Sequence, residues 1–122
     1  MEFKFDTKTT YTVITPLTGR LDDDATAKLA EATRQDYGGD SNNFIVDLSE
    51  CTAADNTSFL VAIHDACYDA QRSFVLTGVS PELKKSLQGH DDAGRLNIAP
   101  TMEEAVDIIA MEILERDLLN EE

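Results

Sequence analysis

One junction near the middle of the chain constrains the fold most. Residues 44–48 form a short, mostly apolar run, and a polar crossing leads from it to a long helical pattern that starts near Asn56. A nearly continuous apolar run is typical of a central strand that is covered on both faces of a sheet. A helix that follows such a strand directly favours an α/β fold with parallel strands.

The helix after this junction has one apolar face. Its apolar side chains recur at three- and four-residue spacing and continue to the end of the pattern, near residue 70. We expect this stripe to face the core: Phe59, Leu60, Ile63, Ala66, Cys67 and Ala70.

Strands and helices alternate along the rest of the chain. Alternating or continuous apolar runs predict strands at residues 3–5, 11–14, 44–48, 73–77 and 96–98. Helical spacing predicts helices at residues 22–37, 56–70, 80–89 and 101–113. The order β-β-α-β-α-β-α-β-α predicts an α/β fold in which four helices pack a mixed sheet of four to five strands.

Local signals mark the ends of these helices. Asp22-Asp23-Asp24 suit a helix cap and first turn, and Gly38-Gly39 suit a helix stop. Ser80 before Pro81 and the capping box that opens at Thr101 start the last two helices. No repeat or linker interrupts the pattern, so we expect a single domain over residues 1–122, with a frayed tail at 118–122.

The charge balance limits the classes of partner. The chain has 24 acidic and 10 basic residues, which gives a formal net charge of −14. Binding to nucleic acid or to an anionic membrane surface needs clustered Lys and Arg, so both are disfavoured. We expect no nucleic acid, no direct insertion into a membrane, and a protein partner with a basic face.

Catalytic and metal-binding patterns are not visible in the sequence. Cys51 and Cys67 are far apart and predict small buried thiols, and His64 and His90 have no metal-ligand spacing or nucleophile triad around them. No glycine-rich nucleotide loop occurs. We therefore expect no metal and no cofactor, and a binding module in place of an enzyme.

The N-terminal residues and the hydropathy bear on location. Residues 1–5 lack the apolar core of a signal peptide, and no apolar run approaches the roughly 20 residues of a membrane span. We expect a cytoplasmic protein.

A hydroxyl group falls at the start of the helix after the junction. Thr57 is predicted in the first turn, where unpaired backbone N–H groups and a partial positive charge face outward. A phosphate there would be held by those amides or repelled by the neighbouring Asp55, which we expect to be the N-cap. This pattern favours a phosphorylation switch at Thr57.

Four segments together resemble the STAS domain family, the module of sulfate transporters and anti-sigma factor antagonists. They are Gly19-Arg20-Leu21-Asp22, Ile45-Val46-Asp47-Leu48 leading to Asp55-Asn56-Thr57-Ser58, Leu76-Thr77-Gly78-Val79-Ser80-Pro81, and Thr101-Met102-Glu103-Glu104-Ala105. Their order and spacing cover the chain from about Phe3 to Ile109. The resemblance implies a STAS-type mixed sheet.

The resemblance also implies a modification site. Phosphorylated antagonists carry the pattern Asp-Ser-Ser-Gly, and their second serine takes the phosphate. Aligned without gaps, that serine falls on Thr57, and the glycine falls on Ser58. Thr57 is thus the phosphorylation candidate, and Ser58 is the second candidate.

A protein partner follows from the same resemblance. The family implies that the loop after the second strand and the helix start bind an anti-sigma factor, usually a serine/threonine kinase of the histidine-kinase-like ATPase class. The residues that this assigns to partner binding are Asp22, Asp23, Asp55, Asn56, Ser58 and Phe59. Phosphate at residue 57 would add about −1.5 to −2 charges to this acidic face and weaken the complex.

Other functions remain open at this point. The chain could be a STAS subunit of a lipid- or ion-transport complex, or a stressosome-like scaffold, in both cases without phosphorylation. An enzyme would need an ordered pocket beside Thr57. The switch itself requires that the Thr57 side chain is exposed, so its burial would contradict the proposal.

Overall fold

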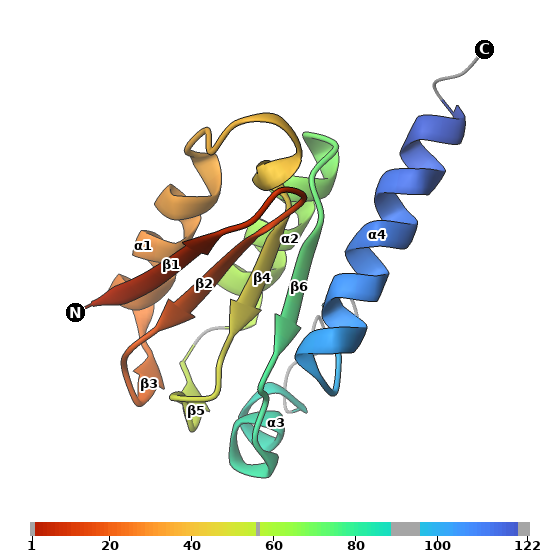
Figure 1. Cartoon of the computed structure of the whole chain (residues 1–122). Coiled ribbons are helices and arrows are strands. Elements are labelled where there is room, and N and C mark those ends of the chain that lie inside the picture. The colour runs from red at the N-terminus through yellow and green to blue at the C-terminus, as the bar shows by residue number, and fades with distance from the viewer. Residues whose placement is uncertain (1, 56, 89–95, 120–122) are drawn as a thin grey trace.

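The computed structural model describes residues 2–55, 57–88 and 96–119. Its elements are β1 (Phe3–Thr7), β2 (Thr12–Pro16), β3 (Arg20–Leu21), α1 (Asp23–Arg34), the 3₁₀ helix η1 (Gly39–Asn42), β4 (Phe44–Asp47), β5 (Ala53–Ala54), α2 (Thr57–Asp69), β6 (Phe74–Thr77), α3 (Pro81–Gln88) and α4 (Met102–Leu119). Helices α1 and α2 lie on one face of the sheet, and α4 lies on the other (Figure 1).

The main sheet has four strands in the order β1-β2-β4-β6. Strands β1 and β2 form an antiparallel hairpin, whereas β2, β4 and β6 pair in parallel. Because β4 and β6 are central or covered on both faces, every apolar side chain in them is buried, as the apolar run predicts. The mixed α/β sheet expected from the sequence is confirmed.

Two apolar clusters hold the layers together. The larger one joins the inner faces of α1, α2 and α3 to one face of the sheet, and its large buried side chains include Leu29, Phe44, Leu60 and Phe74. The smaller one joins α4 to the opposite face through Ile45, Val75, Ala105 and Ile109. Alternation along β2 explains the division, since Thr12, Ile14 and Pro16 are buried while the intervening side chains belong to the α4 side.

Strand β6 is an outer strand of the sheet, and the segment around Ile98 lies along its free edge. Ile98 forms a parallel bridge with Leu76, which is all that the structure keeps of the strand expected at residues 96–98. Beside it, the Tyr68 hydroxyl donates to the Glu112 carboxylate at 2.7 Å and accepts from Asn97 at 2.7 Å. Burial and the Glu112 carboxylate raise the pKa of Tyr68 well above its ordinary value. These contacts tie α2 to α4 and protect an edge strand from pairing with another chain.

Helix α1 ends earlier than the glycines at 38 and 39 predict. Its last residue is Arg34, and Gln35 is extended. The Asp36 carboxylate accepts hydrogen bonds from Asn42 and from the Gly38 amide, which hold its pKa below the ordinary value. A side chain that binds nearby backbone in this way competes with the helix and favours a turn.

Two further differences from the expected elements are small. The two-residue strands β3 and β5, which pair in parallel, were not expected. Helix α4 continues through Leu118 and Leu119, which the sequence analysis placed in a frayed tail, and residues 120–122 lie outside the described part. Both ends of the loop that follows α3 are described, but residues 89–95, including His90, are not.

Candidate partner-docking face

The candidate site lies at the carboxyl edge of the sheet, where β4 leads into α2. The short pair β3–β5 sits beside this edge and brings Arg20 and Leu21 next to Ala53 and Ala54. Two backbone hydrogen bonds fix the crossing, from Thr52 N–H to the Gly19 carbonyl at 2.8 Å and from Asp55 N–H to the Leu21 carbonyl at 2.9 Å. We call the residues exposed around this crossing the docking face: Arg20, Asp22, Asp23, Asp24, Asp55, Ser58 and Phe59.

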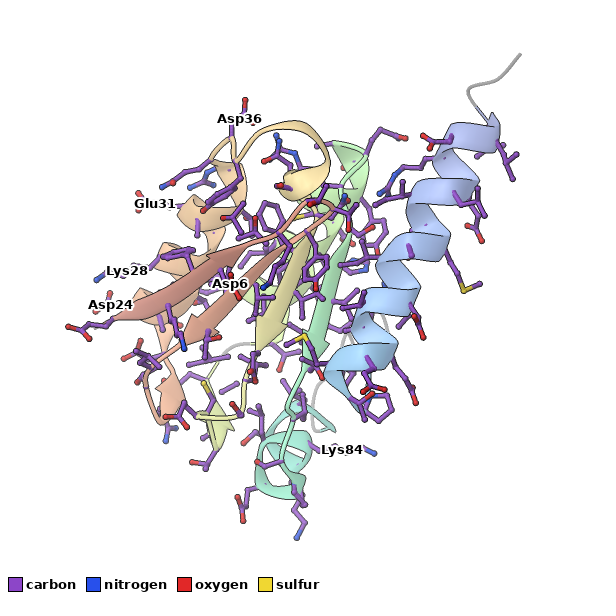
Figure 2. All side chains as sticks on the ribbon, viewed as in Figure 1. Asp6, Asp24, Lys28, Glu31, Asp36 and Lys84 are labelled. Carbon is purple, nitrogen blue, oxygen red and sulfur yellow. The ribbon has the colours of Figure 1, made fainter. Side chains whose placement is uncertain are left out.

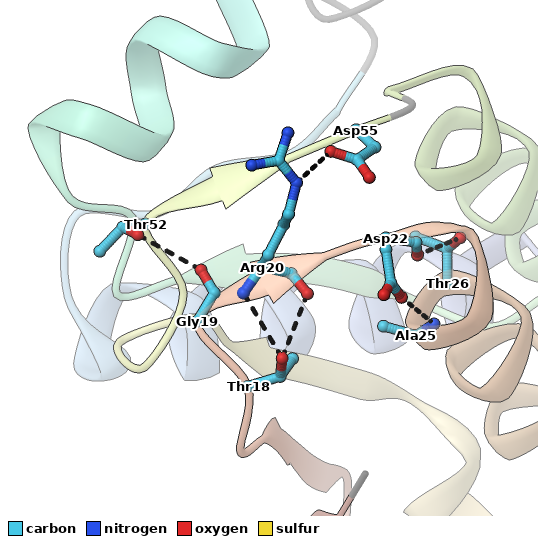
Figure 3. A network of polar contacts seen from close by, with 8 residues as sticks. All are labelled: Thr18, Gly19, Arg20, Asp22, Ala25, Thr26, Thr52 and Asp55. Carbon is cyan, nitrogen blue, oxygen red and sulfur yellow. Dashed lines mark hydrogen bonds and ion pairs between the residues drawn. The ribbon is translucent and has the colours of Figure 1, made fainter.

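Arg20 and Asp55 form an exposed ion pair across the docking face, between the Arg20 Nε atom and the Asp55 carboxylate (Figure 3). The expectation that Asp55 is the N-cap of the helix is wrong, because α2 begins at Thr57 and Asp55 lies two positions before it. Asn56, the other expected contact residue, lies outside the described part of the chain.

The acidic residues after β3 are confirmed as a helix start. Asp22 is the N-cap of α1: its carboxylate accepts from the Ala25 amide at 2.8 Å, and its carbonyl accepts from the Thr26 hydroxyl at 3.1 Å (Figure 3). Asp23 and Asp24 are exposed in the first turn, where the helix dipole favours negative charge. The Asp22 cap fixes the backbone at the start of α1, and the carboxylates of Asp23 and Asp24 face solvent or a partner.

Thr57 is the first residue of α2, but the expectation that its side chain is exposed is wrong. Its side chain is 0% exposed, and its Oγ1 is buried without a hydrogen-bond partner among the described residues. The first turn rotates Thr57 into the core together with Leu60 and Val61, three and four residues later. In this conformation a kinase cannot reach Oγ1 unless the first turn of α2 unwinds.

The neighbouring side chains on α2 are the accessible ones. Ser58 is exposed, and Phe59 keeps 43% of its surface exposed. The predicted apolar stripe is therefore only partly correct, because Leu60, Ile63 and Cys67 are buried, whereas Phe59, Ala66 and Ala70 are not.

Phe59 stands beside an apolar groove of about 410 Å³ between α1 and α2. Small side chains on both helices leave this space: Ala27 and Ala30 on α1, and Ala62 and Ala66 on α2. Glu31 and Arg34 lie along it. The sequence analysis missed the groove, although the paired alanines at helical spacing were its visible signal.

The outer side of α1 continues the charged surface. Asp24, Lys28 and Glu31 all project away from the sheet (Figure 2). Charges of both signs thus lie along α1, and Glu31 is the acidic residue among them that lines the groove.

Both cysteines of the chain are buried thiols. Cys51 and Cys67 are free and buried, and burial raises the pKa of each thiol to about 11. Within residues 2–55, 57–88 and 96–119, no group of three or more metal-binding side chains occurs. Nor does any helix in those ranges combine the length and the apolar character that a membrane span requires.

Comparison with known proteins shows the fold. No family model and no curated protein matches the sequence. Among solved structures, the Thermotoga maritima protein tm1081, described as an anti-sigma factor antagonist, matches with a TM-score of 0.69 at 14% identity, over 88% of this chain and 94% of that one. RsbS of Moorella thermoacetica, with a serine-to-glutamate substitution, matches with a TM-score of 0.67 at 20% identity, over 95% and 99%.

A third match is the unphosphorylated form of the anti-sigma factor antagonist SpoIIAA. Its TM-score is 0.57 at 22% identity, over 89% of this chain and 98% of that one. All three matches extend over nearly the whole of both chains, so the likeness concerns the complete fold and not one shared motif. The chain has the STAS-type fold of the anti-sigma factor antagonists.

Proposed function

We propose that the chain is a regulatory protein-binding module that docks an anti-sigma factor through the docking face. The observation that carries the proposal is Phe59, which is 43% exposed and lines an apolar groove that also has the charged side chains of Glu31 and Arg34 in its lining. An aromatic anchor next to a pocket, with a charged rim, is the usual composition of an interaction hot spot. The fold that the chain shares with antagonists supports an anti-sigma factor as the class of partner.

Charge supports a basic partner. Of the charged groups on the docking face, the cation of Arg20 is already paired with Asp55, whereas Asp23 and Asp24 are exposed. With a net charge of −14, the chain attracts a basic surface over long range and speeds the encounter. A kinase-class anti-sigma factor with a basic docking surface fits this face.

A phosphorylation switch on this face uses Ser58 in preference to Thr57. Ser58 is exposed in the first turn of α2, next to Phe59 and three residues after Asp55. Phosphate there adds about −1.5 to −2 charges beside the Asp55 carboxylate and lowers complementarity with a basic partner. Thr57 becomes a substrate only if the partner unwinds the first turn, since its Oγ1 is buried.

The test combines binding with site-resolved phosphate mapping. The chain is incubated with ATP and a kinase-class anti-sigma factor from the same organism, and the modified residue is identified by mass spectrometry. We expect phosphate on Ser58, loss of phosphate in Ser58→Ala, and retention in Thr57→Val. Phosphate on residue 57 alone would instead show that the first turn opens during the reaction.

Binding is tested separately from modification. Phe59→Ser should weaken the complex by about 100-fold, because a central aromatic anchor contributes about 2–4 kcal/mol. Phe5→Ser is the matched control, since Phe5 is 48% exposed on the edge strand β1 and lies outside the groove. Equal affinity of the Phe59→Ser and Phe5→Ser variants would refute the docking face.

A pull-down of this chain from native cells separates the proposed function from the two alternatives within the same fold class. An ABC-type ATPase would indicate a transport subunit, and a very large assembly in light scattering would indicate a stressosome-like scaffold. The proposal as stated requires an anti-sigma factor, a cytoplasmic location and no turnover of a small-molecule substrate.

A further inference from the structure

We propose that the amino edge of the sheet holds a binding site for a small oxyanion, between Arg72 and Arg116. A cavity of about 260 Å³ lies where β4 and β6 begin. Its lining is polar and comes from three segments of the chain, with the two arginines beside Gly39, Asn42, Asn43 and Asp117. This site lies at the opposite end of α2 from the docking face and is independent of the proposed function.

Neither arginine forms an ion pair with a carboxylate in the described part of the chain. The ion pairs recorded within the described residues are Lys8–Asp6, Arg20–Asp55 and His64–Asp65, and neither Arg72 nor Arg116 belongs to one. Both are only partly exposed. In a chain with 24 acidic and 10 basic residues, two partly buried cations that share a cavity form a local positive centre. Its charge is balanced only in part, by Asp117 in the lining and by Asp36, whose pKa is lowered by its hydrogen bonds and also by the Arg72 charge.

Hydrogen bonds hold each guanidinium by one nitrogen. The Arg72 Nη1 atom donates to the Thr33 carbonyl at 2.9 Å. The Arg116 Nη2 atom donates to Asn43 Oδ1 at 2.9 Å and to the Ser73 hydroxyl at 3.2 Å. Each side chain keeps further N–H donors that make no hydrogen bond to another described residue, so two oriented forks remain available to an oxyanion.

The anchor of Arg116 is itself rigid. Asn43 and Ser73 are 5% and 0% exposed, and the Asn43 Oδ1 atom also accepts from the Ser73 amide at 2.8 Å. Buried, satisfied polar groups of this kind fix the position of the side chain they hold. The cavity is therefore preorganised on the Arg116 side, which lowers the entropy cost of binding.

The surroundings limit the ligand to a small anion of low charge. Asp117 lines the cavity, and Ala70, just after the carboxyl end of α2, brings the negative end of a helix dipole. A volume of about 260 Å³ is also below the range of about 300–1,000 Å³ that holds drug-sized ligands. A phosphate or carboxylate group fits these limits, whereas a nucleotide or a polyphosphate does not.

The experiment is a titration of the isotope-labelled chain with inorganic phosphate, followed by NMR at constant ionic strength set with NaCl. A second arm uses acetate, which separates phosphate from carboxylate ligands. We expect saturable shifts of the Gly39, Gln71 and Arg72 amides and of the Arg116 side chain, with a dissociation constant of about 1 mM. No saturable shift up to about 20 mM of either anion would overturn the proposal.

Variants connect binding to the arginines. Arg72→Gln should weaken phosphate binding about tenfold, because a charge-assisted hydrogen bond is worth about 1.5–3 kcal/mol. Arg72→Lys keeps the charge without the fork and should give a smaller loss, which guards against an effect of misfolding. Arg34→Gln is the matched control on exposed α1 and should bind as wild type does. Equal affinity of Arg72→Gln and Arg34→Gln would show that the shifts come from general charge and would overturn the site.

Discussion

The two edges of the sheet carry opposite charge: the carboxyl edge is mainly acidic, and the amino edge has two arginines in one cavity. At the carboxyl edge, Arg20 is paired with Asp55, and the remaining charges of the docking face are acidic. At the amino edge, Arg72 and Arg116 share a cavity without an ion-pair partner in the described part of the chain. Helix α2 has 13 residues and so joins the two edges over about 20 Å. One chain can thus present an acidic face to a macromolecule and a cationic cavity to a small anion.

The edges also differ in whether their buried polar side chains are hydrogen-bonded. Asn43 and Ser73 at the amino edge bond to each other and to Arg116. Thr57 at the carboxyl edge buries a hydroxyl that has no partner among the described residues. A satisfied network rigidifies its surroundings, whereas an orphaned hydroxyl destabilises them and makes local opening easier. The comparison indicates a fixed amino edge and a carboxyl edge that opens at lower cost.

The largest expected effect on stability comes from Gly78, which follows β6 at the carboxyl edge. Gly78 has a φ of 71°, and a Cβ added there would lie 2.5 Å from Asp47 Oδ1 and 2.9 Å from the Ser49 amide. Gly78→Ala should lower the free energy of unfolding by about 3 kcal/mol, which chemical denaturation measures. Gly19→Ala is the control, because a Cβ at Gly19 meets nothing within 4 Å. An equal effect of both substitutions would show that the close approach at Gly78 is relaxed without cost.

The next largest effect concerns the reactivity of the two buried thiols, of which Cys51 lies near the carboxyl edge and Cys67 near the amino edge. The pKa of Cys51 and of Cys67 is raised to about 11, chiefly by burial. At pH 8 the folded thiols should react with iodoacetamide about 100-fold more slowly than those of the urea-unfolded chain, because the thiolate is the nucleophile. The folded pKa lies above the unfolded value, so their contribution to stability is complete below about pH 8.5 and is lost as the pH rises toward 11. Rapid alkylation of either thiol in the native chain would contradict its burial.

A smaller effect tests the fixed amino edge. Asn43→Ala removes the acceptor of the Ser73 amide and of Arg116, and should lower the free energy of unfolding by about 2 kcal/mol. Asn42→Ala in the same loop removes bonds to Tyr37 and Asp36 at a less buried position and should cost less than half as much. Denaturation of both variants in parallel checks the order, and a reversed order would argue against a rigid anchor at Asn43.

The smallest effect has the opposite sign and tests the carboxyl edge. Thr57→Val replaces the orphaned hydroxyl by a methyl group of similar volume, and should raise the free energy of unfolding by about 1 kcal/mol. Thr33→Val should not stabilise, because the Thr33 hydroxyl donates to the Ala30 carbonyl at 2.9 Å. If Thr57→Val destabilises the chain, its hydroxyl has a partner in solution and the comparison of the two edges fails.

The sequence predicted the parts of the fold that depend on long apolar patterns and on helix caps. The apolar run before Leu48, the Asp22 cap, and the Ser80 and Thr101 starts all appear as expected, with Ser80 Oγ accepting from Leu83 at 3.1 Å and Thr101 Oγ1 from Glu104 at 3.1 Å. These signals are local, so neighbouring residues suffice to read them. The β3–β5 pair depends on a contact between distant segments, which no local pattern records. The early end of α1 comes from the side-chain hydrogen bonds of Asp36 to Gly38 and Asn42, which apolar spacing does not reveal.

The candidate site was predicted in place but not in orientation. Spacing located Thr57 at the start of α2, yet one residue on a helix turns a side chain by about 100°, so Ser58 and Phe59 are exposed where Thr57 is buried. The cavity between Arg72 and Arg116 was beyond prediction, since its two cations are 44 positions apart and no motif joins them.

Hydrogen exchange with mass spectrometry, recorded on the chain with and without a kinase-class anti-sigma factor from the same organism, tests the central claim most directly. We expect protection over β3, the start of α1 and the first two turns of α2, and none around Arg72 and Arg116. Protection confined to the amino edge or to α4, with the first turns of α2 exchanging as they do in the free chain, would contradict the claim that the carboxyl edge is the docking face.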